Sequence, residues 1–198
     1  MDIHTEMSLF SGYGGFSLGL RLAGLNTRTI CYVEWDKYCQ RVLQQRFQDD
    51  PPTLTPAPIW DDIKSFDGRP WRGTVDILSA GFPCQPHSNA GLRKIARGLS
   101  DDRDLWPDCL RVISEVGPKY AILENVPGIN VGNGGRPAYG GTVVGELSEI
   151  GYDAEWRVIS AADAGAPHLR NRWWLLAYPN ADLGGRLHRE HGIESAIR

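Results

Sequence analysis

Short apolar runs alternate along the chain with longer segments in which apolar residues recur every three or four positions. The runs are rich in β-branched and aromatic residues and predict strands, whereas the periodic segments predict helices. The predicted strands are Met7–Phe10, Arg28–Val33, Ala57–Trp60, Val75–Ser79, Tyr120–Leu123, Ala154–Ile159 and Trp173–Ala177. The predicted helices are Phe16–Ala23, Lys37–Phe47, Leu105–Val116 and Thr142–Ile150.

This alternation is typical of an α/β fold with a doubly wound, mostly parallel sheet. Several of the predicted strands are almost entirely apolar, as expected for strands that are covered on both faces. Ligands of such sheets bind beyond the carboxyl ends of the strands, so functional residues should follow strands directly. The alternation of apolar runs and periodic segments ends near Tyr178. We therefore predict one domain over residues 1–178, followed by a polar tail over residues 179–198.

Composition narrows the class of protein further. Of the 198 residues, 41% are hydrophobic and 23% are charged, which excludes disordered and fibrous proteins. No apolar run approaches the ~20 residues that span a bilayer, and the first residues lack the layout of a secretory signal. The composition predicts a cytoplasmic protein with no membrane partner. The net charge of −3 argues against a uniformly basic nucleic-acid surface and leaves room for a local basic patch.

A glycine-rich turn, Ser11–Gly15, follows the first predicted strand and leads into a helix. Glycines there let the backbone pass close to a ligand, but Ser17 replaces the third glycine of the dinucleotide fingerprint, which disfavours NAD and FAD. The second strand ends at Glu34, where a carboxylate could accept hydrogen bonds from ribose hydroxyls, and Trp35 offers a flat face for adenine. The pattern indicates a nucleoside-bearing cofactor without pyrophosphate. The alternative is an ordinary tight turn with a solvated acid.

Cys84 lies between two prolines just after the strand Val75–Ser79, where active-site residues of this fold class occur. A cysteine attacks as the thiolate, which the downstream Arg93, Lys94 and Arg97 would favour. Cys84 is therefore a candidate nucleophile. A Cys–His protease, with His87 or His168 as the base, is an alternative use of the same thiol.

The other three cysteines carry no such signal. Cys31, Cys39 and Cys109 fall within a predicted strand and two predicted helices, and we expect them to be buried and inert. The sequence has no CxxC pair with matching histidines, so it predicts neither a metal site nor a disulfide framework.

Charged residues again lie at strand ends in the second half of the chain. Glu124 follows the strand Tyr120–Leu123, and a carboxyl in a partly dehydrated cleft can exchange a proton near neutral pH. Its alternative role is to cap the next turn. Arg170 and Arg172 occupy alternate positions before the last strand, so in extended chain they would point the same way and could bind an anion or a carbonyl.

Six stretches in order, FSGYGGFSLGL, EWDKYCQRVL, DDI, GFPCQPHSNAG, ENVPG and GAPHLRNR, resemble the DNA (cytosine-5) methyltransferases. The resemblance extends from Leu9 to about Tyr178, and the joint occurrence of these motifs is highly specific. It implies a Rossmann-like methyltransferase fold with S-adenosyl-L-methionine as the cofactor. By the resemblance, the cofactor-binding residues would be Phe10, Gly12, Gly14, Gly15, Glu34, Trp35, Asp62, Phe82, Pro83 and Leu105.

The resemblance also assigns catalytic roles. The substrate would be double-stranded DNA with a flipped cytosine, because the ring cannot be reached inside the stack. The Cys84 thiolate would add to carbon 6 and so activate carbon 5 for methylation. Glu124 would hydrogen-bond ring nitrogen 3 and the exocyclic amine, Arg172 would hold the 2-carbonyl oxygen, and Arg170 would help to close the site around DNA.

The chain departs from the family pattern at two positions and in one region. His87 stands where the family has phenylalanine, and His168 stands where it has glutamine. After Tyr178 we find neither the target-recognition domain nor the final motif, whose helix returns to the cofactor domain in the family. The sequence therefore predicts a truncated enzyme, or a split one completed by a second polypeptide. The alternatives are a transfer-RNA cytosine-5 methyltransferase and a non-catalytic, cofactor-binding regulatory module.

Overall fold

A seven-stranded sheet with the strand order β3-β2-β1-β4-β5-β7-β6 forms the centre of the computed structural model, which describes residues 2–83, 104–131 and 138–180. The strands are β1 (His4–Leu9), β2 (Thr27–Val33), β3 (Ile59–Trp60), β4 (Ile77–Ala80), β5 (Tyr120–Asn125), β6 (Tyr152–Ile159) and β7 (Arg172–Pro179). The helices are α1 (Gly15–Leu22), α2 (Lys37–Phe47), α4 (Trp106–Val116) and α5 (Tyr139–Glu149), with 3-10 turns η1 (Arg69–Trp71) and η3 (Pro127–Asn130).

The first five strands run parallel, and β7 runs antiparallel to both of its neighbours, β5 and β6. This arrangement confirms the predicted α/β fold with a doubly wound, mostly parallel sheet. The sequence pattern did not predict that the last two strands form an antiparallel hairpin, because the alternation of apolar residues carries no strand direction.

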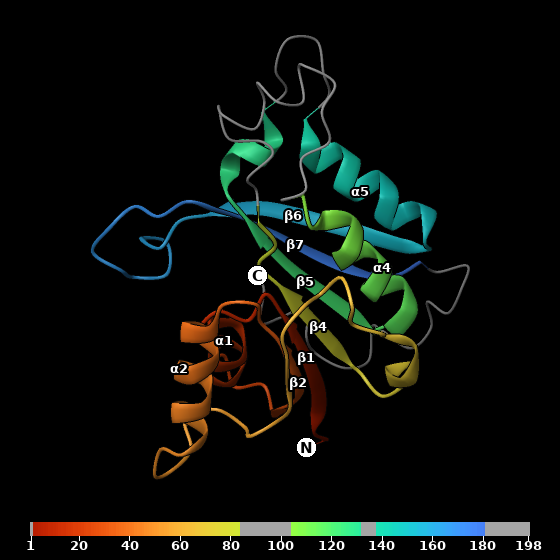
Figure 1. Cartoon of the computed structure of the whole chain (residues 1–198). Coiled ribbons are helices and arrows are strands. Elements are labelled where there is room, and N and C mark those ends of the chain that lie inside the picture. Colours follow the sequence, from red (N-terminus) through yellow and green to blue (C-terminus); the bar gives the residue numbers. More distant parts are fainter. Residues whose placement is uncertain (1, 84–103, 132–137, 181–198) are drawn as a thin grey trace.

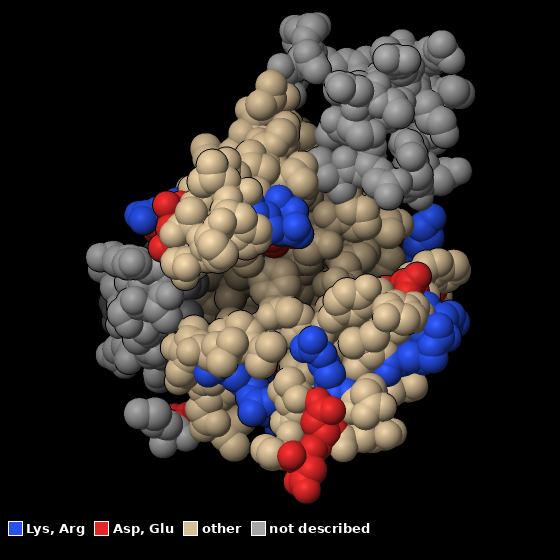
Figure 2. All heavy atoms as spheres, turned by 90° about the vertical axis from the view of Figure 1, so that its left-hand side faces the viewer, with Lys and Arg blue, Asp and Glu red and all other residues tan. Residues whose placement is uncertain are grey.

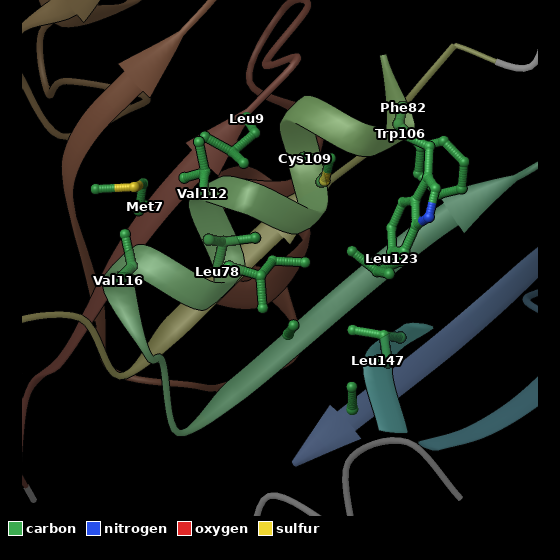
Figure 3. Close-up of a cluster of buried hydrophobic side chains, with 14 of the residues drawn as sticks. Met7, Leu9, Leu78, Phe82, Trp106, Cys109, Val112, Val116, Leu123 and Leu147 are labelled. Carbon is green, nitrogen blue, oxygen red and sulfur yellow. The ribbon is translucent and has the colours of Figure 1, made fainter. Parts of the chain in front are cut away.

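The helices cover the two faces of the sheet unequally (Figure 1). Right-handed crossovers that start at the central β1 and proceed to either edge place α1 and α2 on one face and α4 and α5 on the other. The larger core lies under α4 and α5, where Val112 of α4 packs with Leu9, Leu78 and Leu123 of the strands (Figure 3). This core covers the half of the sheet beneath α4 and α5.

The core on the α1 face is smaller and leaves part of the sheet uncovered. Leu20 of α1 packs there with Ile77, Tyr120 and Ile122 of β4 and β5. Trp174 and Leu176 of β7 lie beside this cluster and are only partly buried. The α1 face of β7 and β6 therefore lacks a covering helix in the described part of the chain.

Several element boundaries differ from the predicted ones. The first strand begins at His4 rather than Met7, and α5 begins at Tyr139 rather than Thr142. Glycine has a low helix propensity, which hides this helix start in the sequence. The Tyr139 hydroxyl donates to the Asp104 carboxylate at 2.8 Å and so anchors the first turn of α5.

Candidate functional site

The glycine-rich turn after β1 has a backbone that few residue types can adopt. Phe10, Gly12 and Gly14 have φ angles of 51°, 53° and 77°, in the left-handed region. For phenylalanine this conformation costs about 1 kcal/mol, and the packing of its ring against the larger core holds it in place. The Ser11 hydroxyl donates to the carbonyl of Ser8 at 2.8 Å, which fixes the turn to the strand.

Glu34, at the end of β2, connects this turn to the neighbouring strand. Its Oε2 accepts the backbone N–H of Gly12 at 2.6 Å, and its Oε1 accepts the N–H of Asp36 at 2.7 Å. The residue is only 9% exposed. Each carboxylate oxygen has a second acceptor direction, so Glu34 can still accept hydrogen bonds from two hydroxyls of a ligand.

Aromatic and acidic side chains surround the ends of β2 and β3. Trp35 is 72% exposed and is the residue directly after Glu34. Asp62 is half-buried, and its Oδ1 accepts the N–H of Lys64 at 2.9 Å. The motifs did not indicate Trp60, which ends β3 and whose carbonyl accepts the N–H of Glu34 at 2.8 Å. The only feature of the sequence that could have indicated Trp60 as part of this site is the aromatic residue at the end of a predicted strand.

The turn after β4 carries the next group of predicted residues. The Phe82 ring is buried against Trp106 of α4, with ring centroids 5.0 Å apart. Its carbonyl accepts Nδ2 of Asn125, the last residue of β5, at 3.0 Å. Pro83 and Leu105, the residue before α4, are half-buried. The ends of four parallel strands thus present the predicted cofactor-binding residues along the same edge of the sheet, apart from Leu105, which precedes α4.

Glu124 and Arg172 form an ion pair between β5 and β7. Arg172 Nε lies 2.6 Å from Glu124 Oε1, and both side chains are 24% exposed. Burial raises the pKa of the Glu124 carboxyl above its usual value, while Arg172 and Arg170 oppose that rise. A Cβ atom at Gly81 would lie 3.4 Å from Glu124 Oε2, so the carboxyl borders the turn that leads to Pro83. The pair can hold a polar ring edge while one carboxyl oxygen gains or shares a proton.

A cavity of about 810 Å³ opens beside this pair, between α1 and the uncovered face of β5, β7 and β6. Arg170 is exposed, and with Glu124 and Arg172 it lines the polar end of the cavity. The apolar lining comes from both sides, namely Phe16, Leu20, Ile122, Trp174, Leu176 and Tyr178. Figure 2, which views this side of the molecule, shows a hollowed surface with Lys and Arg side chains near it. Of the predicted cofactor residues only Gly15 lines this cavity, so it is a space distinct from the surroundings of Glu34.

Cys84, His87 and the basic residues Arg93, Lys94 and Arg97 lie outside the described residues. Cys31 and Cys109 are buried as predicted, whereas the prediction for Cys39 is wrong in part, since its side chain is half-buried at the start of α2. Burial raises the pKa of the Cys109 thiol, raises that of Cys31 to about 12 and raises that of Cys39 to about 11. These three thiols are therefore poor nucleophiles at neutral pH.

No group of three potential metal ligands occurs in the described part of the chain. A tight turn after β1, an acid after β2 and an ion pair between β5 and β7 thus lie on a Rossmann-like sheet, a fold class whose ligands bind beyond the carboxyl ends of the strands.

Comparison with known proteins identifies the family. The family model "C-5 cytosine-specific DNA methylase" matches residues 4–188, so the chain belongs to that family. It is 31% identical over 180 residues to the type II methyltransferase M.NgoMIV of Neisseria gonorrhoeae, a match that covers 89% of this chain and 52% of that protein. It is 32% identical to the type II methyltransferase M.HhaI of Haemophilus parahaemolyticus, with 88% and 49% covered. The chain spans about half the length of the curated relatives it matches.

Solved structures give the same result for the fold. The S. pombe Dnmt2 methyltransferase superposes with a TM-score of 0.68 at 20% identity, covering 90% of this chain and 50% of that one. A putative DNA modification methyltransferase encoded within an Escherichia coli prophage superposes with a TM-score of 0.67 at 26% identity, with 89% and 47% covered. The Rossmann-like methyltransferase fold predicted from the motifs is thereby confirmed.

Proposed function

We propose that this chain is the catalytic and cofactor-binding part of a DNA (cytosine-5)-methyltransferase, which methylates carbon 5 of a flipped cytosine in double-stranded DNA. The observation that carries the proposal is the Glu124–Arg172 ion pair, which borders the turn leading from β4 to Cys84. A carboxyl and a guanidinium fit the ring nitrogen, amine and carbonyl of cytosine. Membership of the C-5 cytosine-specific DNA methylase family supports this use of the pair.

The residues at the strand ends fit S-adenosyl-L-methionine. The left-handed conformation of Gly12 leaves room for a ligand to approach the backbone, since no atom lies within 4 Å of its Cβ position. Gly14 packs against Leu54 and gives the turn its shape. Glu34 would accept the ribose hydroxyls and Trp35 would pack against adenine, while Asp62 would bind the adenine amino group. Phe10, Gly15, Phe82, Pro83 and Leu105 would complete the pocket. When bound, the cofactor would supply the methyl group.

The chain's own residues would prepare cytosine for that transfer. The Cys84 thiolate would form a bond to carbon 6, and the electron pair displaced from the ring double bond would make carbon 5 nucleophilic. Glu124, whose pKa burial raises, would hydrogen-bond ring nitrogen 3 and the amine, while Arg172 would hold the carbonyl oxygen. Once carbon 5 carries the methyl group, transfer of its proton to water would re-form the ring double bond and expel the Cys84 sulfur as the thiolate. Arg170, exposed at the rim, would contact the DNA backbone.

The alternatives have weaker support. Transfer RNA is not favoured as the substrate, because the curated relatives at 31–32% identity named above are type II methyltransferases, whereas the likeness to Dnmt2, at 20% identity, supports the fold alone. A Cys–His protease would leave the Gly12–Glu34 contact without a role. A non-catalytic module would have no need of the Glu124–Arg172 pair. By analogy with the type II relatives, we propose a role in DNA modification in the cytoplasm.

We also propose that activity requires further residues, in the same or a second polypeptide, that supply target recognition and cover the apolar cavity beside α1. The uncovered face of β7 and β6, next to that cavity, supports this proposal. None of the helices that the structure describes is both long and apolar enough to cross a bilayer.

Trapping on DNA that carries 5-fluorocytosine tests the proposed chemistry, because fluorine cannot leave carbon 5 as a proton does. The complete protein that contains these residues should form a covalent adduct, and Cys84→Ala should form none while it still binds S-adenosylhomocysteine. Cys31→Ala and Cys109→Ala are the matched controls and should retain the adduct. An adduct that survives Cys84→Ala would overturn the proposed mechanism.

A further inference from the structure

A buried carboxyl lies in the centre of the sheet, away from the chemistry proposed above. Glu6 of β1 is fully buried, and its side chain lies on the α1 face. Thr29 Oγ1 of β2 donates to Glu6 Oε2 at 2.6 Å, and Ser79 Oγ of β4 donates to Oε1 at 2.7 Å. One carboxyl therefore connects the side chains of three adjacent parallel strands.

A fourth element also reaches this carboxyl. Ser17 of α1 is buried, and its hydroxyl favours the charged form of Glu6. Ser17 Oγ itself has no hydrogen-bond partner of normal geometry among the described residues. The first turn of α1 thus packs against the group formed by Glu6, Thr29 and Ser79.

Three of these elements lead to predicted cofactor-binding residues. β1 leads into the glycine turn and α1, β2 is followed by Glu34, and β4 leads to Gly81, Phe82 and Pro83. The partners of Glu6 precede these residues by only a few positions, five from Thr29 to Glu34 and three from Ser79 to Phe82. A shift of one strand relative to another at Glu6 would therefore move the Gly12–Glu34 contact and the turn after β4 relative to each other.

We propose that Glu6 is a positioning residue for the cofactor site, which holds β1, β2, β4 and α1 in register through its buried carboxyl. This inference rests on the proposed function, because it takes the strand-end residues as the cofactor site.

The surroundings of Glu6 predict how it responds to pH. Its neighbours are Thr29 and the Tyr32 phenol from β2, Ser79 from β4 and Ser17 from α1, and the charge of Arg21 of α1 acts on Tyr32. Burial raises the pKa of the Glu6 carboxyl above the usual 4.5, and the three hydroxyls only partly oppose this rise. The unfolded chain therefore loses this proton at lower pH than the folded chain does. The contribution of Glu6 to stability is complete below pH 4.5 and is lost as the pH rises toward the folded-state pKa.

Two substitutions separate positioning from simple packing. Glu6→Gln keeps the shape and can hydrogen-bond both hydroxyls, but it cannot titrate. Glu6→Leu fills similar space and leaves Thr29 and Ser79 without their partner. Leu147→Val, a fully buried position on α5 on the opposite face, is the control for a general loss of core packing.

The measurements are urea unfolding from pH 5 to 8 and S-adenosylhomocysteine affinity by calorimetry at pH 6, where the folded fraction of each variant is known. As the pH rises, the parent chain loses the stabilisation from Glu6, whereas Glu6→Gln has no such carboxyl to titrate. The ratio of the folding equilibrium constant of Glu6→Gln to that of the parent chain should therefore rise by up to about tenfold per pH unit. Glu6→Leu should bind the probe at least about tenfold more weakly than the parent chain, whereas Glu6→Gln and Leu147→Val should bind it within about threefold.

The outcomes are distinguishable. If the parent chain fails to bind S-adenosylhomocysteine, the proposed function itself is wrong. If it binds, but folded Glu6→Leu binds equally well, the positioning role is wrong. Parallel unfolding profiles for the parent chain and Glu6→Gln would likewise overturn it, since they would mean that Glu6 does not change its protonation on folding.

Discussion

The backbone N–H of Gly12 donates to Oε2 of Glu34 at 2.6 Å, across 22 positions of the sequence. This hydrogen bond joins the turn after β1 to the end of β2, so Glu34 holds the shape of the turn before any ligand binds. The same carboxylate is the proposed acceptor for ribose. Loss of Glu34 should therefore affect both the turn and the cofactor affinity.

Glu34→Ala should weaken the binding of S-adenosylmethionine by about ten- to a hundredfold, because hydrogen bonds to a charged acceptor contribute about 1.5–3 kcal/mol. Isothermal titration calorimetry measures this change. Asp67→Ala removes an exposed carboxylate that pairs with Arg69, and it should leave the affinity unchanged. Equal affinities of Glu34→Ala and the parent chain would remove Glu34 from the cofactor site.

Gly14→Ala should lower the free energy of unfolding by about 1–3 kcal/mol, because Gly14 has a φ of +77° and its added methyl would meet the buried Leu54. Gly19→Ala is the matched control on α1. Gly19 has no atom within 4 Å of its Cβ position, so alanine there should raise the free energy of unfolding by up to about 1 kcal/mol. Urea denaturation of both variants checks the prediction, which fails if the two changes have the same sign.

Arg172→Met should raise the pKa of Glu124 further, because burial then acts with less opposition from a nearby cation. The pKa of Glu124 is higher in the folded chain than the value of about 4.5 in the unfolded chain, so the free energy of unfolding falls as the pH rises from the lower value to the higher one. In Arg172→Met this fall should extend to higher pH. NMR titration of the Glu124 side-chain carboxyl measures the pKa directly. Arg157→Met, at another position lining the cavity, should leave the pKa unchanged, and an equal rise in both variants would contradict the role of the ion pair.

Iodoacetamide at pH 8 should label native protein fastest at Cys84. A thiol with a pKa of about 11, as at Cys39, has roughly one molecule in a thousand as thiolate at this pH, and Cys31 has fewer still. Peptide mass spectrometry after short exposure identifies the labelled residue. Cys84→Ser should abolish the fast phase, and rapid labelling of Cys31, Cys39 or Cys109 in folded protein would contradict the prediction.

These 198 residues alone should transfer no detectable methyl group to duplex DNA. Specific DNA binding commonly buries about 1,000 Å² or more of protein and depends on phosphate contacts, and this chain has a net charge of −3. The check is transfer of tritiated methyl from labelled cofactor, with Cys84→Ala as the blank. Incorporation above that blank would show that the chain needs no further residues.

Local features of the sequence determined much of this protein. The strand and helix positions follow from apolar periodicity. The glycine turn, Glu34 and Phe82 closely follow strands as predicted, because the residues that form turns are neighbours in the sequence, whereas Glu124 lies within β5. The family motifs then indicated a common ligand edge, and the parallel order of β1 to β4 places their ends along that edge.

The tertiary structure alone decided the contacts between distant segments. The antiparallel insertion of β7 beside β5 is what brings Arg172 within 2.6 Å of Glu124. The apolar pattern predicts a first strand that begins at Met7, whereas β1 begins at His4 and includes the charged Glu6. In the folded chain Thr29 and Ser79, from strands 23 and 73 positions away, provide hydroxyl donors for Glu6. A buried carboxyl is tolerated only where such donors replace water, and their presence depends on strand order and register rather than on any local pattern.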